Sequence, residues 1–191
     1  MIPKRVRQFY INLIDRMTEI DSEYARNLLS EEEAGLFFKL QKSEQKHSVR
    51  IAREIEEIFN SENFYEGLLE DTSFDKLISN NSKERVVEIL GKNREKLIKI
   101  ALLHDLGKTE KKLNLIDKSI IVILNKLTSG KLGEFKGLKK LDCYYKHGEY
   151  SYNLLKDMVF DEELLNVIRN HHKDVDNDVL TEFFQIMDDK N

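Results

Sequence analysis

The chain of 191 residues contains one cysteine, one proline, eight glycines and no tryptophan. The single cysteine, Cys143, excludes an internal disulfide and suits a reducing compartment, and we assign it no role. So few prolines and glycines argue against disorder and against a turn-rich β-sandwich. Hydrophobic residues make up 40% of the chain and charged residues 35%. These proportions favour a soluble all-α fold.

Long apolar runs are also missing. No run approaches the ~18 residues of a membrane span, and residues 1–19 lack the pattern of a signal peptide. We therefore expect a cytoplasmic protein with no membrane partner. The net charge of −4 gives no overall attraction to a nucleic-acid polymer. The segment from Lys108 to Lys146, however, contains ten lysines and only four acidic residues. This segment is either a solvated connector or a basic rim that draws an anionic substrate toward a nearby site.

Apolar residues recur at helical spacing along almost the whole chain, and residues that commonly cap helices precede several of the apolar stretches. We predict helices over Phe9 to Ile20, from a capping box at Ser30–Glu33, from a cap at Ser43 to about Phe59, from Asn80–Ser82 to Leu90, from Asn93 to Leu106, and over about 119–127, 146–158, 161–172 and 178–189. The segment 93–106 is apolar on nearly all sides, as expected of a buried central helix. Gly107 is expected to end this helix in a left-handed conformation. We expect one compact unit, in which residues 1–42 form a helical layer packed on residues 43–191.

Several histidines and carboxylates lie on the apolar faces of these helices. His47 shares a helix face with Ile51 and Ile55. On their own predicted helices, four more residues also share a face with apolar residues: His147, His171, Asp105 and Asp188. A buried imidazole or carboxylate needs a hydrogen-bond partner or a cation, because burial of an unpaired polar group costs several kcal/mol. One such histidine is usually a satisfied core residue, but this number from five helices indicates convergence on metal. Imidazole and carboxylate without thiolate suit Fe, Mn, Co, Ni or Zn.

Five segments resemble, in order, the motifs of the HD-domain metal-dependent phosphohydrolase superfamily. They are Gln45–Ala52, Ala101–Lys108, Lys146–Glu149, Ile168–His172 and Ile186–Asp188. The string from His104 to Lys108, His-Asp-Leu-Gly-Lys after an apolar helix, is fairly specific by itself, and the ordered set is strong. The resemblance covers roughly residues 43–191 and leaves residues 1–42 outside. It implies an all-α, HD-domain-like helical bundle with extra N-terminal helices.

The resemblance also implies a ligand set. First-metal ligands match His47, His104, Asp105 and Asp188, while a second metal, bridged by Asp105, matches His147 and His171. One or two divalent transition metals are therefore expected, and two are favoured. Lys108 matches a lysine near the reacting group, with a catalytic and substrate-binding role. His172 is expected to touch substrate, to support a ligand or to be structural, because adjacent helix positions point about 100° apart and would not share one metal. Asp188 lies on a last turn that can fray, so Asp189 is an alternative ligand.

For function, the resemblance implies hydrolysis of a phosphomonoester or phosphodiester by a hydroxide shared between two metals. Asp105 would orient that hydroxide, and Lys108 would neutralise charge on the phosphoryl oxygens. The expected partner is a small phosphorylated substrate, with a nucleotide preferred, but no motif selects among nucleotides, dinucleoside polyphosphates and sugar phosphates. The segment after His172 departs from the cyclic-di-GMP phosphodiesterase branch, which we exclude. Two alternatives stay open: a mixed-valent diiron oxygenase with the same ligand set, and a catalytically silent, metal-containing regulatory or ligand-binding module.

Overall fold

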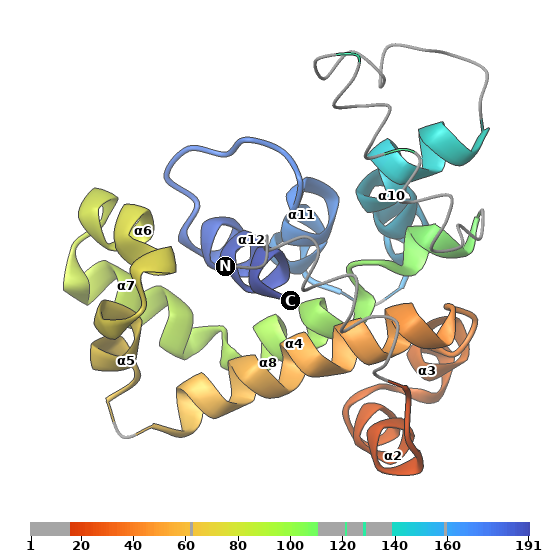
Figure 1. Cartoon of the computed structure of the whole chain (residues 1–191), viewed down its shortest axis with the longest axis horizontal. Helices are drawn as coiled ribbons and strands as arrows, with labels where there is room; N and C mark the ends of the chain where they lie inside the picture. Colours follow the sequence, from red (N-terminus) through yellow and green to blue (C-terminus); the bar gives the residue numbers. More distant parts are fainter. Residues whose placement is uncertain (1–15, 62, 111–120, 122–127, 129–138, 159) are drawn as a thin grey trace.

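A computed structural model of the chain describes residues 16–61, 63–110, 121, 128, 139–158 and 160–191. These residues contain helices and no strand, which confirms the all-α prediction (Figure 1). The helices are α2 (Glu19–Leu28), α3 (Glu31–Phe37), α4 (Lys42–Asn60), α5 (Phe64–Glu70), η1 (Thr72–Phe74), α6 (Asp75–Asn80), α7 (Lys83–Lys92), α8 (Arg94–Leu103), η2 (Leu106–Thr109), α10 (Lys139–Leu155), α11 (Glu162–Asn170) and α12 (Val179–Lys190).

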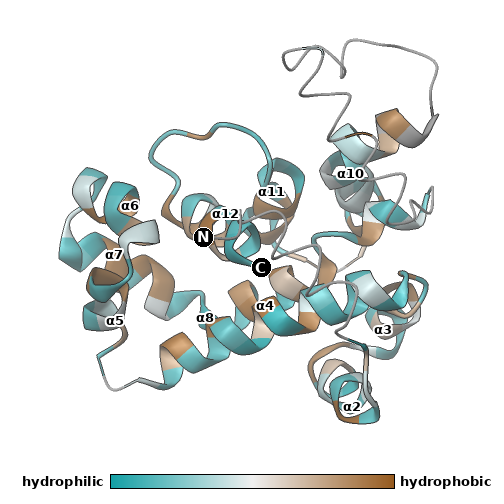
Figure 2. Ribbon diagram, viewed as in Figure 1, coloured by the Kyte–Doolittle hydropathy of each residue, from teal (hydrophilic) through white to brown (hydrophobic). Residues whose placement is uncertain are grey.

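Helices α4 and α8 pack against each other at the centre of the fold, and α11 and α12 pack on α8. The apolar side chains of α8 are buried on several sides, as predicted; Leu97, Ile100 and Leu102 are fully buried. The long helix α4 turns Ile51 and Ile55 inward and most of its charged residues outward, with Glu44 a buried exception, so its ribbon alternates between the two colours of Figure 2. Within the described ranges, no helix combines the length and the apolar character that crossing a membrane requires.

Side-chain caps fix the starts of several helices. Ser30 and Glu33 form the predicted capping box of α3, because the Ser30 hydroxyl accepts from the Glu33 N–H and the Glu33 carboxylate accepts from the Ser30 N–H. Ser82 caps α7, and Asp161 and Asp178 cap α11 and α12. These local interactions set the directions in which the site-bearing helices leave their loops.

Several predicted helix boundaries differ from the structure; the helix predicted over about 146–158, for example, is Lys139–Leu155. Ser43 lies inside α4, whose N-cap position is Gln41. Met17 precedes α2 because Thr18 and Asp21 form a capping box that starts a new helix at Glu19. The remaining part of the predicted first helix, the predicted helix at 119–127 and most of the lysine-rich segment lie outside the described residues.

The end of the central helix also differs. The helix predicted to reach Leu106 ends at Leu103, and a turn at His104 and Asp105 leads into η2. Gly107 lies within η2 and does not have a left-handed backbone. Its missing side chain serves a close approach instead: a Cβ there would lie 2.7 Å from the Ser151 backbone nitrogen of α10. The physical reason for glycine at this position is therefore packing against α10.

The N-terminal helix α2 contacts α4. Asp21 of α2 is buried and pairs with Lys46 and Arg53 of α4, at 2.8 and 3.1 Å. The hydroxyl of Tyr24 donates to Glu56 at 3.1 Å. These contacts attach α2 to the helix that carries His47. The division of the chain at residue 42 stays a prediction.

Candidate metal centre

The predicted ligands come from five separate elements that meet at one place. His47 lies on α4, and His104 and Asp105 lie in the turn after α8. The others are His147 on α10, His171 directly after α11 and Asp188 on α12. Ligand atoms of His47, His104 and Asp105 lie within 4.8 Å of one another, as do those of His104, His171 and Asp188. The fold thus gathers residues separated by up to 141 positions in the sequence.

One half of the cluster surrounds Asp188. The Nε2 atom of His47 lies 2.9 Å from Asp188 Oδ1, and the Nε2 atom of His104 lies 3.6 Å from the same oxygen. His104 Nε2 also lies 3.3 Å from Asp105 Oδ2. Two imidazoles and two carboxylates therefore point at a common volume. This donor set is one that divalent transition metals accept.

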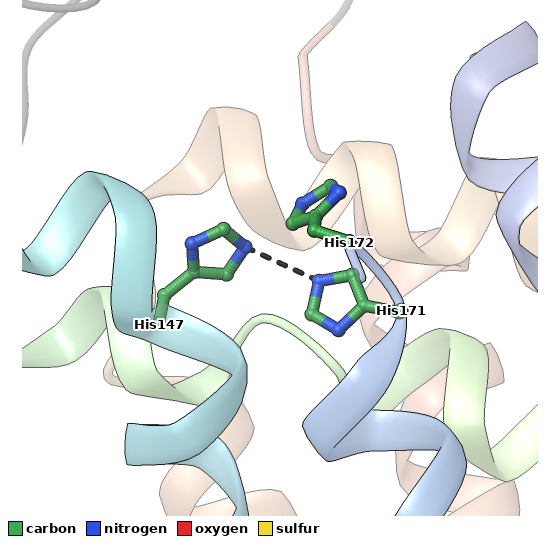
Figure 3. A group of neighbouring side chains, drawn as sticks. All are labelled: His147, His171 and His172. Atoms are coloured by element: carbon green, nitrogen blue, oxygen red, sulfur yellow. Dashed lines mark hydrogen bonds between the residues drawn. The ribbon is translucent and has the colours of Figure 1, made fainter. Parts of the chain in front are cut away.

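The other half of the cluster surrounds the second oxygen of Asp105. Asp105 Oδ1 lies 3.3 Å from His147 Nε2, and His147 Nε2 lies 3.2 Å from His171 Nε2. Figure 3 shows these two rings facing each other from α10 and from the end of α11. The two oxygens of Asp105 thus face different histidines.

The other ring nitrogens fix which tautomers are present. Nδ1 of His104, His147 and His171 donates to the carbonyl oxygen three residues earlier, at 2.9, 2.9 and 2.6 Å. Because a carbonyl only accepts, each Nδ1 carries the proton and a neutral ring leaves Nε2 as a bare lone pair. Backbone carbonyls orient metal-bound histidines in this way.

These tautomers leave the contact between His147 and His171 unsatisfied. Burial, followed by the charge of Lys108, lowers the pKa of His147 to about 3, and burial holds the pKa of His171 well below its usual value. Both rings are therefore neutral near pH 7, and two lone pairs face each other at 3.2 Å. A cation placed between them would turn this repulsion into two bonds.

Buried atoms without partners lie at the same place. Within the described part of the chain, His104 Nε2 and Asp105 Oδ1 are two of four buried side-chain polar atoms that accept or donate no hydrogen bond. Leaving such an atom unpaired costs about 1–3 kcal/mol, and more for a charged group. The donor set and these unpaired atoms together fit a bound metal.

The carboxylates of the cluster are ionised. Burial would raise the pKa of Asp105, but the charges of His104 and Lys108 hold it well below its usual value. Burial would likewise raise the pKa of Asp188, but the neighbouring rings of His104 and His47 hold it well below its usual value. Burial would lower the pKa of His104, yet the two carboxylates raise it to about 10. Without metal, the protein therefore keeps a proton on His104 where a cation is favoured.

His172 lies at the open edge of the cluster. Its side chain is 50% exposed, and its Nε2 lies 3.9 Å from Asp188 Oδ2. Its ring centroid is 4.1 Å from that of His171 and 4.8 Å from that of His147. The expectation that His171 and His172 diverge is wrong, because α11 ends at Asn170 and both residues lie in a turn. Ligand atoms of His147, His171 and His172 lie within 4.8 Å of one another (Figure 3).

Lys108 reaches the cluster from η2. Its ammonium contacts Asp105 Oδ2 and lies 3.0 Å from Glu44 Oε2. Burial would lower the pKa of Lys108, but Asp105 and Glu44 raise it, so the side chain is a cation. Sequence reasoning missed Glu44. A signal was present, since Glu44 lies three residues before His47 and so shares a face of α4 with it.

Ser151 is a second residue that sequence reasoning missed. Its buried hydroxyl accepts from the Gly107 N–H at 2.8 Å and lies 2.5 Å and 2.9 Å from the carbonyl oxygens of His104 and His147. The hydroxyl donates its one proton to the nearer carbonyl, that of His104, and so connects α10 to the turn that holds His104 and Asp105. Because Ser151 is far in sequence from that turn, no local sequence pattern indicates this contact.

Asp188, and not Asp189, points into the cluster. The Asp188 side chain is 10% exposed and contacts two histidines, whereas Asp189 is exposed. The turn after Asp188 is held in place: Arg50 Nε donates to Asn191 Oδ1 at 2.7 Å, and the Asn191 side chain donates to Glu54 at 2.9 Å. The expected fraying is therefore opposed by contacts with α4.

The family model described as HD domain matches residues 45–189. The chain belongs to the HD domain family. The match begins two residues before His47 and ends one residue after Asp188, so it spans the whole cluster. Searches of curated proteins and of solved structures gave no match. Membership places the chain in a superfamily that consists generally of metal-dependent hydrolases, and the cluster is where its HD domain could hold divalent metal.

Proposed function

We propose that the protein is a metal-dependent phosphohydrolase that cleaves a phosphomonoester or phosphodiester of a nucleotide or another small phosphorylated metabolite. The observation that carries the proposal is the environment of Asp105. Its two buried oxygens face separate histidines, His104 on one side and His147 on the other, at 3.3 Å each. A carboxylate placed in this way can serve two cations at once.

His47, His104 and Asp188 would hold the first ion with Asp105, and His147 and His171 would hold the second. Nitrogen and oxygen donors without thiolate suit Fe, Mn, Co, Ni or Zn. When bound, two such ions activate water and polarise a phosphoryl oxygen. Asp105, ionised and fully buried, keeps both halves of the site at a fixed separation.

Lys108 supplies a positive charge beside Asp105. Its side chain is 21% exposed, so part of it borders the side of the site that a ligand could enter from solvent. A fixed cation there would stabilise negative charge that grows on the phosphoryl oxygens during in-line attack. His172 lies half-exposed at the edge of the site, where its ring can donate a hydrogen bond to the substrate.

The test uses the adjacent residues Asp188 and Asp189 as a matched pair. Wild type, Asp105→Ala, Asp188→Asn and Asp189→Asn would be purified without chelator, and bound metal would be measured by mass spectrometry. Hydrolysis would then be screened with Mn or Co under argon, by phosphate release for nucleotide and sugar monophosphates and by chromatography of the products for phosphodiesters. We expect Asp105→Ala and Asp188→Asn to lose metal and turnover, while Asp189→Asn keeps both. Full turnover in Asp105→Ala would rule out the mechanism. In aerated samples, oxygen consumption tied to iron redox state, without hydrolysis of any phosphate ester, would favour an oxygenase.

A further inference from the structure

Glu44 is a second carboxylate that holds the ammonium of Lys108, beside the metal ligand Asp105. The carboxylate is on α4, its side chain is 7% exposed, and Oε2 lies 3.0 Å from Lys108 Nζ. Lys108 belongs to η2, which follows the turn of His104 and Asp105. A glutamate from one element and an aspartate from another thus hold one lysine between them.

Metal binding changes the balance between these two contacts. Cations on the oxygens of Asp105 would neutralise the carboxylate that now attracts Lys108, and would repel the ammonium. The long lysine side chain would also gain rotamer entropy by leaving. Glu44 lies outside the group of ligand atoms, so its charge stays available to Lys108. A buried carboxylate bonded to the ammonium opposes that departure.

We propose that Glu44 is a positioning residue that keeps the Lys108 ammonium in the site when metal occupies Asp105, so that the ammonium can bind a phosphoryl oxygen. This inference rests on the proposed function. Glu44 itself does not touch the substrate in this scheme. Its effect on phosphate binding depends on Lys108. A glutamate with a purely structural role, which only joined α4 to η2, would not show this dependence.

A double-mutant cycle tests that route. Metal-loaded full-length wild type, Glu44→Gln, Lys108→Met and the double variant would be compared for metal content, for binding of inorganic phosphate by calorimetry, and for kcat and KM. Loss of a charge-assisted hydrogen bond predicts roughly tenfold weaker phosphate binding in Glu44→Gln, with metal content unchanged. In the Lys108→Met background, the same substitution should change binding less than about twofold, because coupled residues are not additive.

Glu33→Gln is the matched control. Glu33 is also buried and also accepts from a lysine, Lys99, at 2.8 Å, but it lies on α3 away from the cluster. We expect Glu33→Gln to leave phosphate binding unchanged. Glu44→Asp keeps the negative charge and should therefore retain more phosphate affinity than Glu44→Gln. This comparison shows whether the loss in Glu44→Gln comes from the missing charge or from a folding defect.

The outcomes separate this inference from the proposed function. Equal losses from Glu44→Gln with and without Lys108, or an equal loss in Glu33→Gln, would overturn the role of Glu44. Wild type that binds phosphate and hydrolyses neither phosphomonoesters nor phosphodiesters would overturn the hydrolase, and the binding cycle would still decide the role of Glu44. Metal-loaded wild type that binds no phosphate would overturn the inference as well.

Discussion

Replacing Gly107 with alanine should push η2 away from α10 and weaken the second half of the metal centre. The added Cβ would lie 2.7 Å from the Ser151 nitrogen and from the Tyr150 Cβ, and closer still to the His147 carbonyl oxygen. Ordinary van der Waals contact begins at 3.4 Å, so the shortfall is at least about 0.7 Å. The nearest atoms belong to the backbone of α10 and cannot rotate away.

The expected cost follows from this rigidity. Overpacking of a core costs about 1–3 kcal/mol, and the upper end applies where backbone has to move. For a chain of this length, about 3 kcal/mol lowers the melting temperature by roughly 6–12 °C. The same shift moves His147 relative to Asp105, whose Oδ1 is now 3.3 Å from His147 Nε2. Gly107→Ala should therefore bind less metal than wild type.

Thermal unfolding and metal content measured on the same samples would check both effects. Gly91→Ala is the control, because nothing lies within 4 Å of a Cβ there and alanine in a helix is worth about 0.5–1 kcal/mol over glycine. Gly107→Asn adds a sharper comparison. Asparagine tolerates a left-handed backbone, so it would be milder than alanine if conformation required the glycine. If Gly107→Asn proves milder, or Gly107→Ala unfolds and binds metal like wild type, the packing argument is refuted.

The remaining predictions concern the supports and the protons of the site. Ser151→Ala removes the acceptor of the buried Gly107 N–H and should cost about 1–3 kcal/mol in unfolding free energy by chemical denaturation; an unchanged denaturation midpoint would show that the hydroxyl does not connect α10 to the turn. Because the pKa of His104 is raised to about 10, metal has to displace its proton, and calorimetry in buffers of different ionisation enthalpy at pH 7.5 should show about one proton released. Below that pKa, metal affinity should rise with pH by up to about tenfold per unit; affinity that is independent of pH between 6 and 9 contradicts this assignment.

The parts of the fold that could be predicted from sequence depend on local interactions. The capping box at Ser30 and the caps at Ser82, Asp161 and Asp178 act within three residues, so their patterns are visible in the chain. The buried helix α8 was also predictable, because it is apolar on nearly all sides. The short helices α5 and α6 were not predicted. They have one or two buried residues each, such as Leu68 and Leu77, and too few turns to show a period.

The candidate site also has a part that local sequence patterns reveal and a part that depends on tertiary contacts. Histidines and acids on apolar faces were visible one helix at a time, and the fold brings them together as the metal hypothesis requires. Glu44 and Ser151 were missed because their roles depend on partners 64 and 44 residues away. The role of Gly107 was misassigned for the same reason. A glycine after a helix suggests a turn, whereas the close approach of α10 is a tertiary contact that no local pattern reveals.

The central claim is that His104, Asp105 and their neighbours bind two divalent ions. Anomalous X-ray scattering at the absorption edge of the bound metal, from crystals of protein purified without chelator, would test it most directly. We predict two peaks about 3.5–4 Å apart with Asp105 between them, one of them about 2.0–2.1 Å from His104 Nε2. Crystals of protein that retains metal in solution, yet shows no peak near His104 and Asp105, would contradict the account.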